Sequence, residues 1–538
     1  MSAAGRNLPF VRSPGRCCRL PFLALLLLVF VGSAFAQGDE SLADYARRVR
    51  APKKQEVLVS AAEGALLFKS VDEISQFASQ DCGLPRLGPI KRQLIGHAET
   101  EKRFVLQTED EAQHERRMDE AALVLKKFGM LPPHFELGAA LSDYSLNSLA
   151  GFYDFNDKTM YLLNWIEPEM QKMVMAHELT HALQDQSYHL ADFVDVPRQA
   201  PDARQMNMVR EDTSELSIAR RAVIEGQATV VGLDYVLRDK GISLADSPKA
   251  RQLANSLLLA SYNPAVTIHN APRLLREVMI FPYREGLLFE LELLTHGGRQ
   301  LAFQSAFKRP PINTHQVLQP EAYLRNEKAP LVPIGDLTAV FGNAYEPYDS
   351  GSIGEFDVQI MAQDFGREND IYTVARQWNG GSYVAVKRTG VAPGTPLGTA
   401  DLALVYLSRW NTGKAGERFG QIYLQALAKR LSVTDTTQRL CEEDPCNGPL
   451  WEQHANSSEG PVNIELWPGN RLIITHGVDN ARMMALRPIL LSPTAAAPRA
   501  SLEAPELSLR LLDLPQMQAL SERAGEEIYE QLQQLLAQ

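Results

Sequence analysis

Hydrophobic residues follow helical spacing through the middle of this chain and mixed spacing after Pro330. From Pro168 to Leu183 they occupy nearly every face of a helix, which is typical of a helix buried in a core. A second helix is predicted from a start signal at Asp212–Glu215 through the apolar run that ends at Val231. Both segments are therefore expected inside the protein.

Strand patterns precede and follow these helices. Aromatic and branched residues on either side of an Asn-Asp turn predict a β-hairpin between Gly151 and Leu163. After Pro330, strands are predicted at 383–386, 402–407 and 472–475, with a helix at 411–431. The expected fold class is α+β, with a small mixed sheet and a buried helix, then a helical part, then a C-terminal α+β accessory domain.

The length of 538 residues allows two or three domains. The predicted divisions are a leader at 1–36, a helix-rich N-terminal subdomain or propeptide-like region at 37–133, a central domain at 134–330, an α+β accessory domain at 331–491, and an Ala- and Pro-rich linker with a terminal amphipathic helix at 492–538. The sequence leaves open whether 37–133 is removed.

The first 36 residues have the pattern of a secretory signal peptide. Four arginines precede the apolar run from Pro21 to Val31, and Ala34-Phe35-Ala36 offers a cleavage site before Gln37. The run is shorter than the roughly 20 residues of a membrane span, and an uncleaved anchor is the alternative. We expect export to a periplasm or an extracellular space, with no stable membrane span after cleavage.

The net charge of the chain is negative. It is −11, and removal of the four leader arginines takes it to −15. An acidic exported protein is not expected to bind nucleic acid. The sequence carries no signal for the oligomeric state.

The candidate chemistry lies in His177-Glu178-Leu179-Thr180-His181, within the first of the two predicted helices. Helical residues four apart lie on one face, about 5 to 6 Å from each other. Both imidazoles could therefore bind one Zn²⁺ at about 2.0 to 2.1 Å, with Glu178 near enough to hold a water molecule. The alternative is a satisfied structural histidine pair, although two buried histidines without a partner would be costly.

A catalytic zinc takes a third protein ligand and leaves its fourth position for water. Gln184 and Ser187 stand where a metzincin motif requires Gly and His, which excludes that arrangement. Glu225 is the better candidate, because a lone carboxylate in an apolar helical run needs a cation to offset its burial. Gly226 beside it leaves room for another helix to approach closely. The alternative is an ion pair between Glu225 and Arg221.

The motif at 177–181, followed by Glu225-Gly226-x-Ala228, resembles the gluzincin branch of the zincin metallopeptidases over about residues 150 to 232. The resemblance implies a zincin-like catalytic unit with one catalytic Zn²⁺. His177, His181 and Glu225 would be the ligands and Glu178 the general base. It also implies an edge strand beside the metal that pairs with the substrate, for which Met160–Leu163 is the candidate.

The chain departs from thermolysin-like enzymes at Thr229, where they carry an Asp that orients a zinc-binding histidine. Asp185 is expected to serve as the hydrogen-bond acceptor instead. Gluzincins also place a Tyr or His donor opposite the base to stabilise the oxyanion. Tyr283 and His315 are the candidates for that role.

The expected function is an exported zinc metallopeptidase that hydrolyses peptide bonds in a protein or peptide substrate. Two alternatives stay open: a catalytically silent binding or scaffold protein of the zincin fold, and a zinc hydrolase of a non-peptide substrate. The sequence gives neither the cleavage preference, nor endo or exo action, nor the role of the C-terminal domain.

Three cysteines remain after the leader. Cys441 and Cys446 bracket an acidic turn that an oxidising compartment could close as a disulfide. Cys82 is expected as a buried structural thiol. The alternative is a zinc-blocking cysteine, because its setting faintly resembles that of matrix-metallopeptidase propeptides.

Overall fold

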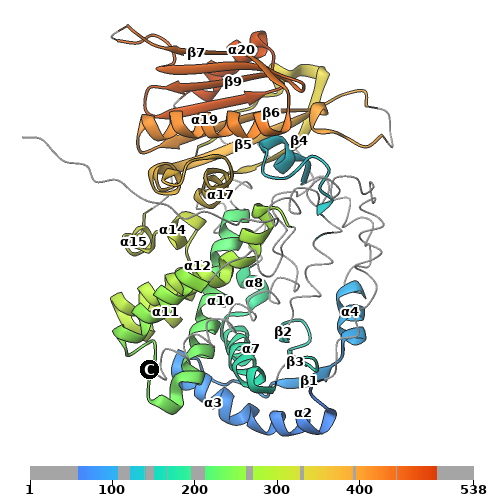
Figure 1. Ribbon diagram of the computed structural model, residues 1–538, viewed down its shortest axis with the longest axis vertical. Helices are drawn as coiled ribbons and strands as arrows, with labels where there is room; N and C mark the ends of the chain where they lie inside the picture. Colours follow the sequence, from blue (N-terminus) through green and yellow to red (C-terminus); the bar gives the residue numbers. More distant parts are fainter. Residues whose placement is uncertain are drawn as a thin grey trace, which may run out of the picture. The chain divides into compact units, whose positions relative to one another are not determined.

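The protein combines helices with two β-sheets, which confirms the α+β class (Figure 1). The computed structural model describes residues 58–106, 122–137, 140, 151–166, 168–194, 213–261, 271–327, 332–391, 395–443 and 445–492. The predicted signal peptide and the predicted terminal helix lie outside the described residues.

The smaller sheet has three strands in the order β1-β3-β2. Strands β2 (Gly151–Asp154) and β3 (Thr159–Leu163) form the predicted hairpin, and β1 (Lys91–Ile95) pairs with β3 in parallel. Strand β3 is therefore central, and the prediction that Met160–Leu163 is an edge strand was wrong. All five β3 residues are buried, as expected for a strand paired on both sides. Strand β1 begins with exposed polar residues, so the sequence shows no hydrophobic alternation that would predict a strand there.

Three long helices follow in layers: α7 (Pro168–Tyr188) packs on this sheet, α10 (Thr213–Leu237) packs on α7, and α12 (Arg273–Arg299) packs on α10. The first two are the helices predicted from the hydrophobic pattern. A Cβ atom added to Gly226 would lie 2.3 Å from the carbonyl oxygen of Gly286, and one added to Gly286 would lie 2.3 Å from that of Ala222. The backbones of α10 and α12 therefore touch, which confirms the close approach expected at Gly226.

The larger sheet has seven strands in the order β4-β5-β6-β10-β9-β8-β7, and every neighbouring pair is antiparallel. The strands are β4 (Tyr345–Ser352), β5 (Trp378–Arg388), β6 (Leu402–Trp410), β7 (Val433–Leu440), β8 (Trp451–Ser457), β9 (Gly460–Trp467) and β10 (Arg471–His476). The strands predicted after Pro330 lie within β5, β6 and β10.

Helices α19 (Gly413–Arg430) and α20 (Asn480–Leu490) pack on the larger sheet (Figure 1). Alternate residues of β6 join different hydrophobic clusters: Leu404 and Tyr406 share one with α19, whereas Val405 and Leu407 share another with α20. Because successive strand residues point to opposite faces, the two helices cover opposite faces of the sheet.

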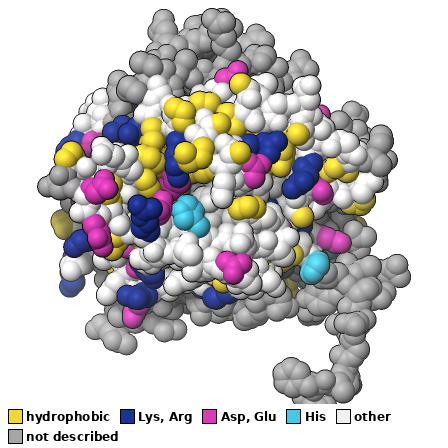
Figure 2. All heavy atoms as spheres, turned by 90° about the horizontal axis from the view of Figure 1, so that it is seen from above, with side chains coloured by type: hydrophobic (Ala, Val, Ile, Leu, Met, Phe, Trp, Pro, Cys, Tyr) yellow, Lys and Arg dark blue, Asp and Glu magenta, His cyan; other side chains and the backbone are white. Residues whose placement is uncertain are grey.

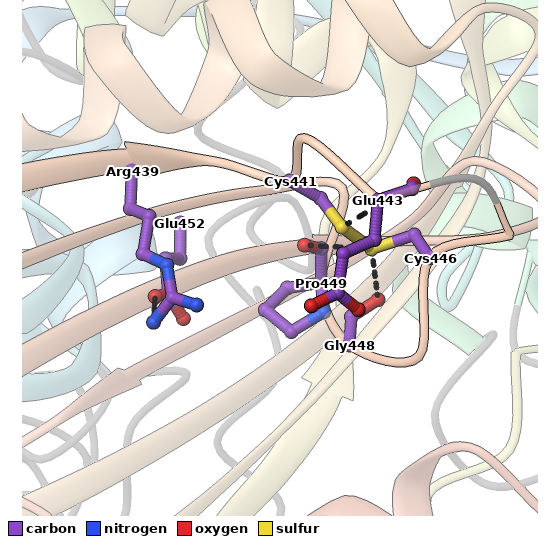
Figure 3. Close-up of a disulfide and its surroundings, with 7 residues drawn as sticks. All are labelled: Arg439, Cys441, Glu443, Cys446, Gly448, Pro449 and Glu452. Atoms are coloured by element: carbon purple, nitrogen blue, oxygen red, sulfur yellow. Dashed lines mark hydrogen bonds and ion pairs between the residues drawn. A yellow bond between two sulfur atoms is a disulfide. The ribbon is translucent and has the colours of Figure 1, made fainter.

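The loop between β7 and β8 is closed by a disulfide between Cys441 and Cys446 (Figure 3). This confirms the bond expected from the acidic turn. Beside it, Arg439 of β7 and Glu452 of β8 form an ion pair of 3.7 Å across the hairpin. The covalent link therefore secures the hairpin that ends one side of the larger sheet.

The described part of the predicted N-terminal region contacts helix α7 and residues of the larger sheet and of α19. Helix α3 (Val71–Cys82) shares a hydrophobic cluster with α7. In residues 122–128, the ring of Phe128 lies among three tyrosines, Tyr383, Tyr406 and Tyr423. The buried ammonium of Lys127 contacts the Glu459 carboxylate at 2.9 Å. Phe128 and the three tyrosines belong to the largest hydrophobic cluster of the described residues.

Among the described helices, none combines the length and hydrophobicity needed to cross a membrane. Lys and Arg side chains are interspersed with Asp and Glu side chains over the described surface that Figure 2 shows.

Candidate metal centre

Helix α7 brings the two motif histidines together, as the sequence predicts. His177 and His181 lie one turn apart on the same face, and their Nε2 atoms are 2.9 Å from each other. Both side chains are buried. The pair faces α10, the helix that carries Glu225.

Glu225 completes a triangle with the two histidines. Its Oε2 atom lies 3.2 Å from Nε2 of His177 and 3.3 Å from Nε2 of His181. In a tetrahedral zinc site with bonds of about 2.0 to 2.1 Å, ligand atoms are about 3.3 Å apart. The three side chains therefore have the chemistry and nearly the spacing that a bound metal ion requires. Glu225 contacts the histidines, in agreement with the ligand hypothesis.

Glu178 is a buried carboxylate for which the described residues provide no hydrogen-bond donor. Only 1% of the residue is exposed, and neither carboxylate oxygen has a hydrogen-bond partner among the described residues. A buried polar group of this kind costs free energy unless something outside the protein chain satisfies it. A water molecule held between Glu178 and a metal would do so, which fits the role expected from the motif.

The charges of the three metal-ligand candidates depend on one another. Burial lowers the pKa of His181, but the charge and hydrogen bond of Glu225 outweigh it and, with Glu178 and Gln184, raise this pKa to about 9. Burial raises the pKa of Glu225, and the histidines reverse this and lower it to about 2. The buried carboxylate thus needs a positive charge beside it, which a proton or a metal ion can provide.

Gln184 orients His181, in place of the residue predicted for that role. Its Oε1 atom lies 2.9 Å from Nδ1 of His181. Asp185 instead accepts hydrogen bonds from Tyr153 and Lys158, at 3.0 and 2.6 Å, so the prediction that it supports the metal site was wrong. Its side chain leaves α7 toward the β2–β3 hairpin. Thr229 donates to the carbonyl oxygen of Glu225, at 2.7 Å.

Of the two oxyanion candidates, the structure places only Tyr283 near the site. The centroid of its buried ring lies 6.5 Å from that of His177. His315 is bound through Nδ1 to Glu355. Its neighbour Thr314 donates to Glu215, ten residues before Glu225 on α10 and hence about 15 Å away along the helix axis. His315 is therefore remote from the metal-ligand candidates.

A second group of possible metal ligands, Glu452, His454 and Glu465, lies on the larger sheet. The Glu465 carboxylate is already bound by the Arg487 guanidinium, whose nitrogens lie 2.6 and 3.1 Å from its oxygens. An arginine cannot give up its charge under ordinary conditions. This group is therefore neutralised by the protein itself, unlike the triangle on α7 and α10.

Cys82 is a buried thiol without a disulfide partner. Burial raises its pKa to about 12. A protonated thiol is a poor zinc ligand, because zinc binds the thiolate. The environment of Cys82 agrees with a structural role.

No protein-family model, no curated protein and no solved structure matches this chain. The residues of the site are therefore the basis for inferring its function. Sequence reasoning missed Gln184 as the partner of His181, although a glutamine within an apolar helical run was a usable signal. A buried amide needs hydrogen bonds as much as a buried carboxylate needs a cation.

Proposed function

We propose that the protein is an exported zinc metallopeptidase of the gluzincin type, with a zincin-like catalytic unit. The observation that carries this proposal is the buried triangle of His177, His181 and Glu225 beside the carboxylate of Glu178, which has no hydrogen-bond partner in the described part of the chain. Two imidazoles and one carboxylate are a donor set found in catalytic zinc sites. A lone structural histidine pair would not explain why Glu178 is buried with no donor among the described residues.

The side chains have separate roles in peptide hydrolysis. A zinc ion at the triangle would supply Lewis-acid activation of water and of the scissile carbonyl. Glu178 would take the proton of the attacking water and deliver it to the leaving amine. Tyr283, close to His177, is the candidate donor to the developing oxyanion. These side chains lie on the three helices α7, α10 and α12.

Strand β2 is a better candidate than β3 for binding a substrate strand. Strand β3 is paired on both sides, whereas β2 has one partner strand among the described residues. Tyr153 of β2 donates to Asp185 of α7, which ties this strand to the helix that carries the motif. A peptide added to β2 would gain main-chain hydrogen bonds with modest side-chain selectivity.

Metal content and proteolysis test the proposal together. The purified protein is expected to contain one zinc per chain and to digest unfolded casein, with activity lost in a chelator and restored by zinc. His177→Ala should lose zinc, whereas His454→Ala, in the neutralised group, should retain it. Glu178→Gln should retain zinc and lose at least a hundredfold in rate.

The outcomes separate the alternatives. Zinc without casein cleavage would favour a binding protein or a hydrolase of another substrate class. Full activity of zinc-loaded Glu178→Gln would overturn the general-base mechanism, and a wild-type protein that binds no zinc would overturn the proposal as a whole.

A further inference from the structure

Two buried glutamines connect His181 to backbone carbonyl groups on two other segments. His181 Nδ1 is 2.9 Å from Gln184 Oε1, and Gln184 Nε2 is 3.1 Å from Gln227 Oε1. Gln184 Nε2 also donates to the carbonyl of Ile224 at 3.1 Å, and Gln227 Nε2 donates to that of Ala302 at 2.8 Å. His181 and both glutamines are fully buried.

The two carbonyls fix the direction of every hydrogen bond in this chain of contacts. A backbone carbonyl can only accept, so the side-chain atom that faces it must be an amide nitrogen. The carbonyl of Ala302 therefore turns Gln227 so that its oxygen faces Gln184. The carbonyl of Ile224 turns Gln184 so that its oxygen faces His181. Nδ1 of His181 must then be the donor, because an amide oxygen offers no proton.

We propose that Gln184 and Gln227 are positioning residues that hold the Nδ1 proton of His181 and thereby direct its Nε2 lone pair to the metal. This inference rests on the proposed zinc site and adds the residues that prepare one of its ligands. Metal-binding histidines generally donate their second ring nitrogen to an acceptor, which fixes the tautomer and the ring orientation. Here the side-chain oxygen of Gln184 is that acceptor, and Gln227 holds Gln184 in turn. We call these two glutamines the amide relay.

The relay also joins three separate parts of the fold at the metal site. Gln184 belongs to α7 and Gln227 to α10, two residues after Glu225. Ala302 lies in the π-helical segment Gln300–Ser305, which follows the break in α12 at Gly298, where φ is +61°. The wider turn of a π-helix often occurs at functional sites. The geometry of His181 therefore depends on how α7, α10 and this segment pack.

Zinc affinity, measured by competition with a chromophoric chelator, tests the relay apart from activity. Methionine has nearly the shape of glutamine without its amide. Gln184→Met should weaken zinc binding about ten- to hundredfold, because His181 loses its acceptor. Gln227→Met should weaken it less, because Ile224 still orients Gln184. The double variant should resemble Gln184→Met alone, since residues that act as one unit are not additive.

Gln171→Met is the matched control. Gln171 is also a fully buried glutamine of α7, and it donates to the carbonyls of Leu163 and Ile166. It has the same kind of buried amide but no contact with a metal-ligand candidate. This variant is expected to lose stability while its zinc affinity and the visible spectrum of its Co²⁺ form stay those of the wild type.

Two results would overturn the proposed role of the relay and leave the zinc site intact. One is a zinc affinity of Gln184→Met within twofold of that of the wild type. The other is a double variant whose loss of zinc affinity equals the product of the losses in the two single variants. If a variant is poorly folded, the Co²⁺ spectrum of its soluble fraction distinguishes a disturbed His181 from a general loss of stability. A disturbed His181 changes the ligand field of the metal, whereas lost stability alone leaves the spectrum like that of the wild type. A wild type that binds no zinc would refute the proposed function itself.

Discussion

At the residue scale, the metal-ligand candidates were predictable and their support was not. His177 and His181 follow from helical spacing, because a helix fixes which side chains share a face. Glu225 follows from its place as a lone carboxylate in an apolar helical run, and from the resemblance to gluzincins. Gln184 gives a weaker signal: a buried amide needs hydrogen-bond partners, but the sequence does not show that these are His181 on its own helix and Ile224 and Gln227 on α10. Asp185 shows why such support is hard to predict. It is charged and lies one helical turn after His181, yet its carboxylate binds Tyr153 and Lys158 instead.

Zinc affinity should depend on pH through His181. Its pKa is raised to about 9 in the metal-free protein, so near neutral pH a zinc ion must displace a proton from this ring. Apparent affinity should therefore increase as the pH rises from 6 to 9, by up to about tenfold per unit for one displaced proton. Chelator competition at several pH values measures this slope. A flat profile from pH 6 to 8 would contradict it.

Glu290 of α12 provides a separate pH prediction, for stability. It is fully buried, and burial raises its pKa well above the usual value, outweighing the contribution of Gln227. The folded state then binds this proton more tightly than the unfolded state does, so stability is lost as the pH rises above about 4.5. Glu290→Gln, which cannot ionise, should be stabilised relative to wild type more at pH 8 than at pH 5.

Urea denaturation at the two pH values measures that difference. Equal differences between variant and wild type at pH 5 and pH 8 would show that Glu290 does not carry the pH dependence. The comparison needs no metal or substrate, so it is independent of the proposed function.

At the scale of elements, long periodic segments were predicted and strand order was not. The helices α7 and α10 and the hairpin follow from local hydrophobic patterns. The central place of β3 depends on β1, more than 60 residues earlier in the chain, whose polar residues give no hydrophobic alternation. Pairing between distant segments is a tertiary property, and one sequence does not reveal it.

The contact between α10 and α12 gives a prediction for Gly226→Ala. The added Cβ would lie 2.3 Å from a backbone oxygen of Gly286, and backbone cannot move as cheaply as a flexible side chain. The helices should separate, at a cost of at least about 1 to 3 kcal/mol in the free energy of unfolding. Because Glu225 is the adjacent residue, zinc affinity should fall as well.

Gly232→Ala on the same helix is the control. A Cβ there would lie 3.6 Å from the carbonyl oxygen of Met173, an ordinary contact distance. Alanine is the better helix former, so this variant is expected to be as stable as wild type or more stable. Equal unfolding midpoints for the two variants would show that the close helix contact is unimportant.

At the scale of the whole molecule, the region predicted as a subdomain or propeptide contributes to the structure at several points. It supplies β1, the helix α3 behind α7, and Lys127 and Phe128 beneath the larger sheet. Composition suggested a separate leading region, because helix-rich charged segments look alike whether they are removed or retained. The long-range contacts show that the described part of 37–133 packs against the rest of the chain, and its removal stays a question for experiment.

Shortened chains test this arrangement. A chain that begins at residue 37, the expected product of signal cleavage, should fold and bind zinc like the full-length protein. A chain that begins at residue 134 should be unfolded, because β3 loses its parallel partner and Glu459 loses a buried counter-ion. Circular dichroism and zinc content measure the outcome. A folded, zinc-binding chain from residue 134 would identify the region as removable.

The ion pair of Lys127 with Glu459 also sets an order of events during biosynthesis, because 332 positions separate the two residues along the chain. At about 5 to 20 residues per second, a ribosome needs roughly 20 to 60 seconds to add that length. Residues 122–128 must wait, without their packing partners, until most of the chain has been made. The last contacts of the core therefore form only near the end of translation, so a nascent chain stays incomplete for most of its synthesis.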